Sequence, residues 1–154
     1  MAYEPQLHIV LYNPEIPQNT GAIGRTCVAL QAKLWLVRPL GFRVDDRTLK
    51  RAGLDYWQHL EWEVADHRED LCGKLATDDC WFFSRFATKD FRTPSYRAGN
   101  VLVFGCETSG LPLSLTKDRK EQLLRIPTSE DVRSLNLSSA VAVAGYEWQR
   151  NCQM

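Results

Sequence analysis

The 154-residue sequence has no long hydrophobic run and no excess of charge of either sign. No apolar stretch approaches the ~18 residues that span a bilayer, and the start "MAYEPQLHIVLYNPEIP" lacks the basic and apolar segments of a signal peptide. Lys and Arg together number 19, as do Asp and Glu, so the summed field gives no indication of a nucleic-acid partner. These absences predict a cytoplasmic protein without membrane contact, which would meet a polyanion only through local basic clusters.

Cysteine and histidine are also sparse. The five cysteines form no C-x-x-C pair, and the three histidines have no spacing typical of zinc ligands. We therefore expect reduced thiols and no metal. The chain also lacks both the G-x-G-x-x-G fingerprint and a phosphate loop ending in Gly-Lys-Ser/Thr, which argues against a nicotinamide or nucleoside triphosphate cofactor.

What the sequence does contain is a regular alternation of short apolar runs and helix-like stretches. Its 44% hydrophobic and 25% charged residues are typical of globular proteins, and its length fits one domain over residues 1–154. The apolar runs predict strands at 7–12, 33–37, 80–84, 101–105 and 122–127, with a weaker one at 60–64. Helices are expected at 19–31, 45–52, 66–76, 112–121 and 136–150. This alternation predicts an α/β fold with a mostly parallel sheet of five or six strands flanked by helices.

Ligands of such sheets bind beyond the carboxyl ends of the strands, where three loops are unusual. The first is "NPEIPQNTGAIGR", residues 13–25, in which Asn19 or Thr20 is expected to cap the following helix. Arg25, about two turns into that helix, carries a guanidinium suited to bidentate contact with phosphate. The alternative is an ordinary surface arginine lying over the sheet.

The second loop is "FGCETSGLP", residues 104–112. Gly105 has no Cβ, so a flat ligand could lie against its backbone. Glu107 could line a binding site, or its charge could simply favour the dipole of the next helix. Cys106 has no histidine near it in the sequence to act as a base, so a thiol nucleophile is not indicated.

The third loop, "IPTSEDVRSLNLSSAVAVAG", leads into a helix that Ser134 or Asn136 is expected to cap. Apolar residues form one stripe on this helix, and small or aromatic residues widen it. The stripe comprises Leu137, Val141, Ala144 and Trp148, widened by Ala140, Val143 and Tyr146 or Glu147. A helix apolar on two sides predicts a homodimer in which this helix meets its twofold copy. The alternative is a second helix of the same chain.

Taken together, the three loops resemble, in content and order, the three motifs of SPOUT-class RNA 2'-O-methyltransferases. The matching residues are Asn19-Thr20-Gly21 with Arg25, Gly105-x-Glu107-x-x-Gly110-Leu111, and Ile126-Pro127 followed by Ser134-Leu135-Asn136-Leu137-Ser138. "LYNPEIPQNTG", "RPLGF" and "RAGLDYW" are further similar to the small YibK or TrmL type. The resemblance covers nearly the whole chain, with departures at Ala22, Cys106 and Ser109.

The resemblance implies S-adenosylmethionine as the cofactor and a C-terminal trefoil knot. It implies methylation of the ribose 2'-hydroxyl of the wobble nucleotide of tRNA, a cytidine or uridine at position 34, with leucine tRNAs as the expected substrates. The cofactor contacts would fall on Phe86, Gly105, Ile126, Ser134 and Leu135, many of them through the backbone. The residues expected at the reaction are Arg25, Asn19, Glu107, Ser134, Asn136 and Tyr146.

For Arg25 we expect a clamp on phosphate and the 2'-oxygen, because an arginine keeps its proton. Tyr146 could contact the target nucleotide, or it could be a packed aromatic with a wet hydroxyl. Two basic clusters are expected to bind tRNA, Arg47, Lys50 and Arg51 in one and Lys89, Arg92 and Arg97 in the other; the first could equally be a solvated helix face.

Two other functions remain open on the sequence. One is an enzyme of the same class acting on ribosomal RNA or on another tRNA position. The other is a non-catalytic RNA-binding module that uses the same basic clusters.

Overall fold

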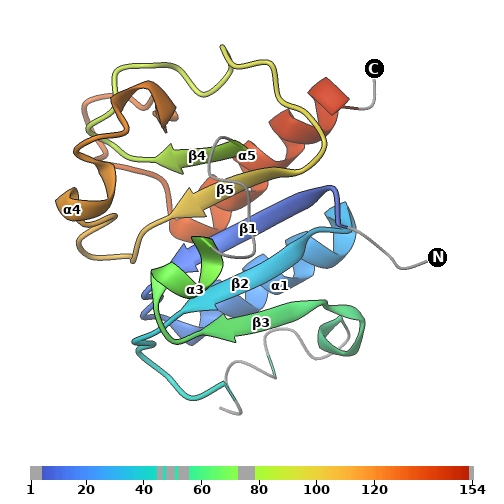
Figure 1. The fold of residues 1–154 in the computed structure, drawn as a ribbon. Coiled ribbons are helices and arrows are strands. Elements are labelled where there is room, and N and C mark those ends of the chain that lie inside the picture. Colours follow the sequence, from blue (N-terminus) through green and yellow to red (C-terminus); the bar gives the residue numbers. More distant parts are fainter. Residues whose placement is uncertain (1–4, 45–46, 48–50, 52–55, 73–78, 153–154) are drawn as a thin grey trace.

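The computed structural model describes residues 5–44, 47, 51, 56–72 and 79–152, and within them the chain builds a parallel sheet with helices on both faces (Figure 1). The strands are β1 (Leu7–Tyr12), β2 (Lys33–Val37), β3 (Trp62–Ala65), β4 (Cys80–Phe83), β5 (Asn100–Phe104) and β6 (Leu123–Leu124). They lie in the order β3-β2-β1-β5-β4-β6, and each neighbouring pair is parallel. The predicted fold class is confirmed.

The two central strands explain why the sequence showed continuous apolar runs. Every residue of β5 is buried, as are Leu7, Ile9, Val10 and Leu11 of β1, because helices cover both faces of the sheet. The longer helices, α1 (Pro17–Leu30) and α5 (Leu137–Cys152), lie together on one face. The short helices α3 (Arg68–Cys72) and α4 (Leu113–Thr116) lie on the other, and two 3₁₀ turns, η1 (Trp57–His59) and η3 (Lys120–Gln122), complete the elements.

The start of α1 differs from the prediction. The helix begins at Pro17, a residue favoured at the first helical position, and Ile16 before it offers no side-chain cap. Asn19 and Thr20 are therefore not caps but buried residues of the first turn. The acceptor for this helix end comes from a distant segment, as described below.

Two predicted elements are much shorter than expected. The helix predicted over 112–121 is reduced to α4 and η3, because Leu113 and Leu115 alternate with polar residues and provide no stripe of helical period. The strand predicted over 122–127 contains only β6. After β6, Arg125 forms an isolated bridge with Asp90, and Pro127 cannot donate to a ladder.

Two further helices are only partly described. The helix predicted over 66–76 is observed as α3, and residues 73–76 lie outside the described residues. Of the helix predicted over 45–52, only positions 47 and 51 are described, and both are helical and exposed.

Helix α5 packs on the sheet and on α1 with one side only. Val141, Ala144 and Trp148 are buried, and Gly145 admits Leu30 of α1 so closely that a Cβ there would lie 2.5 Å from Leu30 Cδ1. A helix of the same chain thus covers part of α5, as one alternative anticipated. Val143 and Tyr146 remain 41% and 47% exposed.

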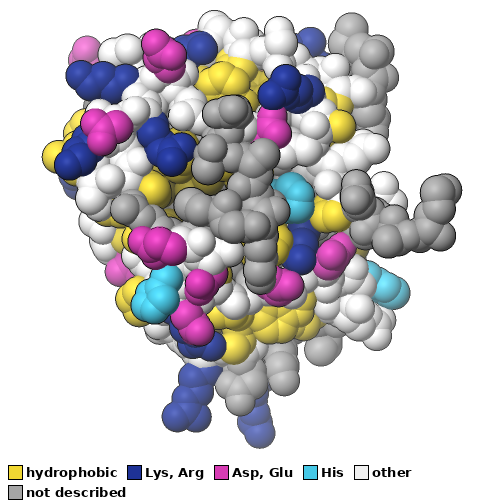
Figure 2. All heavy atoms as spheres, viewed as in Figure 1, with side chains coloured by type: hydrophobic (Ala, Val, Ile, Leu, Met, Phe, Trp, Pro, Cys, Tyr) yellow, Lys and Arg dark blue, Asp and Glu magenta, His cyan; other side chains and the backbone are white. Residues whose placement is uncertain are grey.

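One face of the molecule carries mixed charge (Figure 2). On the face seen in Figure 2, acidic and basic side chains are interspersed rather than gathered into one field. No helix in the described part of the chain is long and apolar enough to cross a membrane. The C-terminal knot implied by the resemblance stays a prediction.

Candidate active site

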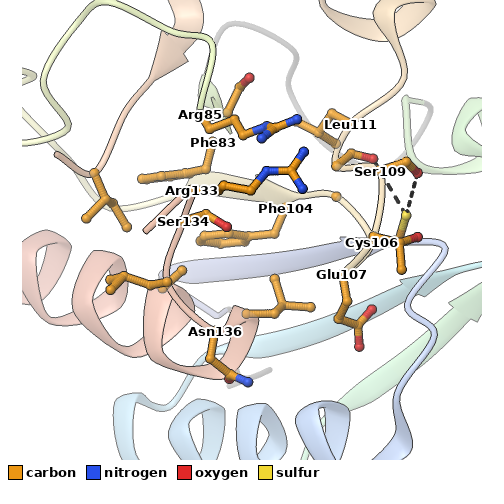
Figure 3. A pocket seen from close by; sticks show the side chains of 18 of the residues that line it. Phe83, Arg85, Phe104, Cys106, Glu107, Ser109, Leu111, Arg133, Ser134 and Asn136 are labelled. Carbon is orange, nitrogen blue, oxygen red and sulfur yellow. Dashed lines mark hydrogen bonds between the residues drawn. The ribbon is translucent and has the colours of Figure 1, made fainter. Parts of the chain in front are cut away.

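A cavity of about 410 Å³ opens where the carboxyl ends of β4, β5 and β6 meet (Figure 3). Segments far apart in the sequence line it: residues 83–86, 104–111, 125–126 and 133–137, with Ile16, Asn19 and Ala140. Parallel strands bring these segments together because their carboxyl ends share one edge. The volume is in the range of small-molecule sites.

The cavity has an apolar floor and polar edges. The rings of Phe83 and Phe104 stack with centroids 4.7 Å apart and an interplanar angle of 12°. Ile126 and Leu137 add apolar surface, and the loop of Ser134 supplies a hydroxyl and backbone groups. This combination suits a flat heteroaromatic group with a polar tail, as in a nucleoside-derived cofactor.

Gly105 allows the second loop to fold back on itself. A Cβ at this position would lie 2.1 Å from the carbonyl carbon of Gly110, closer than any side chain tolerates. Gly110 has a φ of +68°, and its N–H donates to the carbonyl of Cys106 over 3.0 Å. The loop therefore presents backbone to the cavity. Cys106 also lies there, with Sγ 2.9 Å from Ser109 Oγ.

Glu107 joins this loop to the start of α1. Its carboxylate accepts hydrogen bonds from the backbone N–H of Glu15 (2.9 Å), the N–H of Ile16 (2.8 Å) and Asn19 Nδ2 (3.2 Å). A negative charge at this place also favours the dipole of α1, rather than that of the following helix. Both oxygens of the carboxylate are thus bound by groups of the chain itself.

A second carboxylate, from the first loop, binds groups of the second loop and so strengthens the same junction. Glu15 accepts from the N–H of Thr108 (3.0 Å) and from its hydroxyl (2.8 Å), and these bonds lower the pKa of Glu15. Glu15 and Thr108 were not among the site residues predicted from the sequence. An acidic residue just before a helix start was the available signal, but its partner is 93 positions away.

The third loop ends in the predicted cap. Asn136 Oδ1 accepts from the N–H of Ser138 (2.9 Å), and the carbonyl of Asn136 accepts from the N–H of Ala140. The expectation that Ser134 or Asn136 caps this helix is confirmed for Asn136. Ser134 is then free to face the cavity beside Phe104 (Figure 3).

The structure brings most of the predicted site residues together. All residues expected to contact the cofactor line the cavity, namely Phe86, Gly105, Ile126, Ser134 and Leu135. Of the residues expected at the reaction, Asn19, Glu107, Ser134 and Asn136 also line it.

Arg25 and Tyr146 do not line the cavity of their own chain. Arg25 is exposed on α1, with its guanidinium carbon 4.5 Å from the ring centroid of Tyr56. Tyr146 lies on the exposed side of the neighbouring helix α5.

Three arginines that the sequence analysis did not select line the cavity: Arg85, Arg125 and Arg133. Arg85 follows a predicted strand and Arg133 lies in the third loop, which was a usable signal. Arg125 lies within the strand predicted over 122–127, so no such signal marked it. Among the described residues, none of the three side chains forms an ion pair.

The predicted RNA-binding residues of the 87–100 loop lie outside the cavity. Arg92 binds Asp90 (2.7 Å), and this hydrogen-bonded pair lowers the pKa of Asp90 to about 2. Arg97 binds Asp79 (2.6 Å), whereas Lys89 lies over the Trp81 ring at 5.1 Å. Arg47 and Arg51 are exposed, and Lys50 lies outside the described residues. In the described residues, no three His, Cys, Asp or Glu side chains gather as they would around a metal ion.

Residues 6–146 match the model of the SpoU rRNA Methylase family. The chain belongs to this family. The resemblance of the three loops to RNA 2'-O-methyltransferases is thereby confirmed. Among its relatives in the SpoU family, a protein of Methylovorus glucosotrophus named tRNA (cytidine(34)-2'-O)-methyltransferase is 41% identical, over 93% of this chain and 94% of its own. One of Saccharophagus degradans with the same name is 41% identical over 93% and 94%.

Solved structures of similar proteins have the same fold. One, described as giving structural insights into the 2-OH methylation of C/U34 on tRNA, is 42% identical, with a TM-score of 0.88 and 96% of each chain covered. An AdoMet-bound rRNA methyltransferase from Sinorhizobium meliloti is 27% identical, with a TM-score of 0.85 over 96% of this chain and 57% of that one.

Proposed function

We propose that this protein is an S-adenosylmethionine-dependent methyltransferase that methylates the 2'-hydroxyl of nucleotide 34 of tRNA, a cytidine or uridine. The observation that carries this proposal is the single cavity built by all three motif loops, lined by every residue expected to contact the cofactor. Relatives named for this reaction, 41% identical over more than nine-tenths of the chain, support the same substrate. Residues 1–154 would act as one cytoplasmic methyltransferase domain.

The cavity residues fit the cofactor. The floor of Phe104 and Ile126 would take the adenine, and the backbone at Gly105 and Leu135 would bind its polar edge. When bound, S-adenosylmethionine supplies an electrophilic methyl group on a sulfonium. The protein must then hold the ribose hydroxyl in line with that methyl group and exclude water.

The distant position of Arg25 supports a homodimer. Helices α1 and α5 pack against each other, so their exposed residues form one outer surface: Ala22, Arg25 and Ala29 from α1 with Ser139, Val143 and Tyr146 from α5. Small and apolar residues on such a surface suit close contact between two copies. Twofold pairing would place Arg25 and Tyr146 near the cavity of the other subunit.

In that arrangement Arg25 would contact the phosphate and the 2'-oxygen. A guanidinium remains protonated, so it would stabilise the developing alkoxide rather than remove the proton. Asn19 and Glu107 would act indirectly. Asn19 Nδ2 donates to the Glu107 carboxylate, which also accepts from two backbone N–H groups at the start of α1. They position the loops that surround the reacting groups.

The tRNA would be bound by surfaces beside the cavity. Arg47, Lys50 and Arg51 would contact phosphates, as would Lys89. Arg92 and Arg97 are exposed too, but each already forms an ion pair, with Asp90 and Asp79 respectively. A phosphate would have to compete with these carboxylates. We propose leucine tRNAs as the substrates.

The decisive experiment is mass spectrometry of tRNA after incubation with purified protein and S-adenosylmethionine. We expect a 2'-O-methyl group at position 34 of leucine tRNAs that lacked it, and no methylation of ribosomal RNA. Methylation confined to ribosomal RNA or to another tRNA position would contradict the proposal. Absence of saturable S-adenosylmethionine binding in calorimetry would instead indicate a non-catalytic RNA-binding module.

Single-turnover kinetics test the role of Arg25. Arg25→Ala should slow methyl transfer by about a hundredfold or more, the scale of lost transition-state electrostatics, with unchanged cofactor affinity. Undiminished transfer by this variant would refute the role.

A further inference from the structure

Phe86 is the most prominent exposed aromatic residue at the cavity. Its backbone N–H is fixed by Ser84 Oγ (3.1 Å), yet its side chain is 76% exposed. The guanidinium carbon of Arg85 lies 4.5 Å from the ring centroid. The arginine covers one face of the Phe86 ring, and the other face is open. Because the ring is mostly exposed, it is not needed to fill the cavity.

Arg133 reaches the same opening from the third loop. Figure 3 shows Arg85 and Arg133 extending over the cavity in the same direction, toward Leu111. The acidic residue of the cavity lining, Glu107, is already bound to the start of α1. Two guanidiniums at one opening repel each other, so their placement there favours an anionic ligand.

The arginines of the neighbouring loop provide a contrast within the same molecule. Arg92 and Arg97 each have a carboxylate partner within 2.7 Å. Arg85 and Arg133 have no ion pair with any residue that the structure describes. Their charge is therefore available to a ligand.

We propose that Arg85, Phe86 and Arg133 form the RNA-binding mouth of the cavity. The free face of Phe86 stacks on an unpaired base next to the nucleotide that is methylated, and the two arginines bind the phosphates on either side. The inference rests on the proposed function for its choice of RNA as the ligand. Aromatic stacking with cationic contacts to the backbone is a general way of binding single-stranded RNA, and it requires an unstacked loop rather than a duplex.

Binding of an anticodon stem-loop RNA, followed by fluorescence anisotropy at several salt concentrations, tests the two parts separately. Phe86→Ala should weaken binding by about tenfold without changing the salt dependence, because stacking releases no counterions. Phe86→Tyr keeps an aromatic ring at this position and should bind the RNA with wild-type affinity. Arg85→Gln and Arg133→Gln should each reduce the slope of log K against log salt by about 0.7, the value for one phosphate contact on single-stranded RNA.

Arg150→Gln is the matched control. It makes the same charge change near the end of α5, where Arg150 is bound to Glu147 (2.7 Å), and should leave the slope unchanged. Arg85→Gln, Arg133→Gln and Arg150→Gln should bind S-adenosylmethionine in calorimetry with wild-type affinity. RNA binding by Phe86→Ala is measured without the cofactor, so that a cofactor contact at Phe86 does not enter the comparison. Wild-type RNA affinity and slope in the three mouth variants would overturn the inference.

The outcomes also separate this inference from the proposed function. If the wild type methylates position 34 but the mouth variants bind RNA normally, only the inference fails. If the wild type binds the stem-loop through these residues but transfers no methyl group, only the proposed function fails. Absence of stem-loop binding by the wild type would overturn the inference that Arg85, Phe86 and Arg133 bind RNA.

Discussion

At the scale of single residues, buried or half-buried polar groups hold the loops of the cavity in place. Glu107 and Glu15 exchange hydrogen bonds between the second loop and the first. Both were visible in the sequence as acidic residues near helix starts. Their partners were not, because a hydrogen bond between residues 92 positions apart has no periodicity to reveal it.

Glu107→Gln should lower the free energy of unfolding by about 1–3 kcal/mol, the usual cost of breaking hydrogen bonds to a charged group. The amide has one acceptor oxygen where the carboxylate has two, and it loses the charge that favours the start of α1. Urea denaturation measures the change. Glu121→Gln, an exposed acidic residue in η3, is the control and should change stability little; equal losses in both variants would contradict this role for Glu107.

His8 should make stability depend on pH near neutrality. Burial, and secondarily the nearby charge of Lys33, lower the pKa of His8 below its usual 6.5, and its Nδ1 accepts from Trp35 Nε1 over 3.1 Å. Because the unfolded chain takes up this proton first, the contribution is complete above pH 6.5 and is lost as the pH falls toward the lower folded value. The free energy of unfolding should therefore fall as the pH is lowered from the usual histidine pKa of 6.5 toward the lower pKa of folded His8.

The variant His8→Gln keeps an acceptor for Trp35 but does not titrate. Its unfolding free energy should vary less over the same pH range. The pH at which the His8 ring titrates in NMR spectra provides an independent measurement, and a midpoint at or above 6.5 would contradict the assignment.

At the scale of elements, helices and strands were predicted near their observed bounds where apolar residues recur in a clear pattern. Strands β1 and β2 were predicted at their observed bounds because buried parallel strands are apolar throughout. The segments around α4 and β6 were predicted too long, because few apolar positions there constrain the backbone and tertiary hydrogen bonds end the elements. Arg125, for example, leaves β6 to pair with the segment at Asp90.

Gly105→Ala tests the loop that follows β5. Its Cβ would meet backbone atoms of Gly110 and Leu111 at 2.1 and 2.2 Å, and these atoms cannot move aside as a side chain can. The loop must open, and we expect S-adenosylmethionine affinity in calorimetry to fall at least about tenfold, as when a binding site is misplaced. Gly99→Ala is the control: a φ of +93° makes it unfavourable too, but it lies outside the cavity, so it should lose stability while keeping cofactor affinity. Wild-type affinity in Gly105→Ala would show that the loop does not bind the cofactor.

At the scale of the whole molecule, the outer surface of α1 and α5 is the proposed contact between two copies of the chain. Val143→Glu would place a charge at the centre of the proposed twofold contact, where a like charge from the other copy would face it. Sedimentation should then change from a dimer to particles of 17.7 kDa. A wild type that already sediments at this mass would exclude the dimer.

Mixing two inactive variants tests whether Arg25 acts across that contact. A mixed dimer of Arg25→Ala with Gly105→Ala contains one site with an intact cavity and an intact arginine, so random mixing should restore about a quarter of wild-type activity. If Arg25 serves its own chain, no intact site arises and the mixture stays inactive. Each variant mixed with itself provides the baseline.

The sequence by itself determined the parallel α/β fold, the order of the elements and the segments that meet at the cavity. It could do so because apolar period and motif order are local properties of the chain. Only the tertiary structure decided which charges are free and which are neutralised: Arg92 and Arg97 are paired, Glu107 holds the start of α1, and Arg85 and Arg133 face the cavity opening without a carboxylate partner among the described residues. The physical reason is that electrostatic pairing depends on distances of a few ångströms between residues far apart in the chain, and these distances exist only once the sheet has brought its loops together.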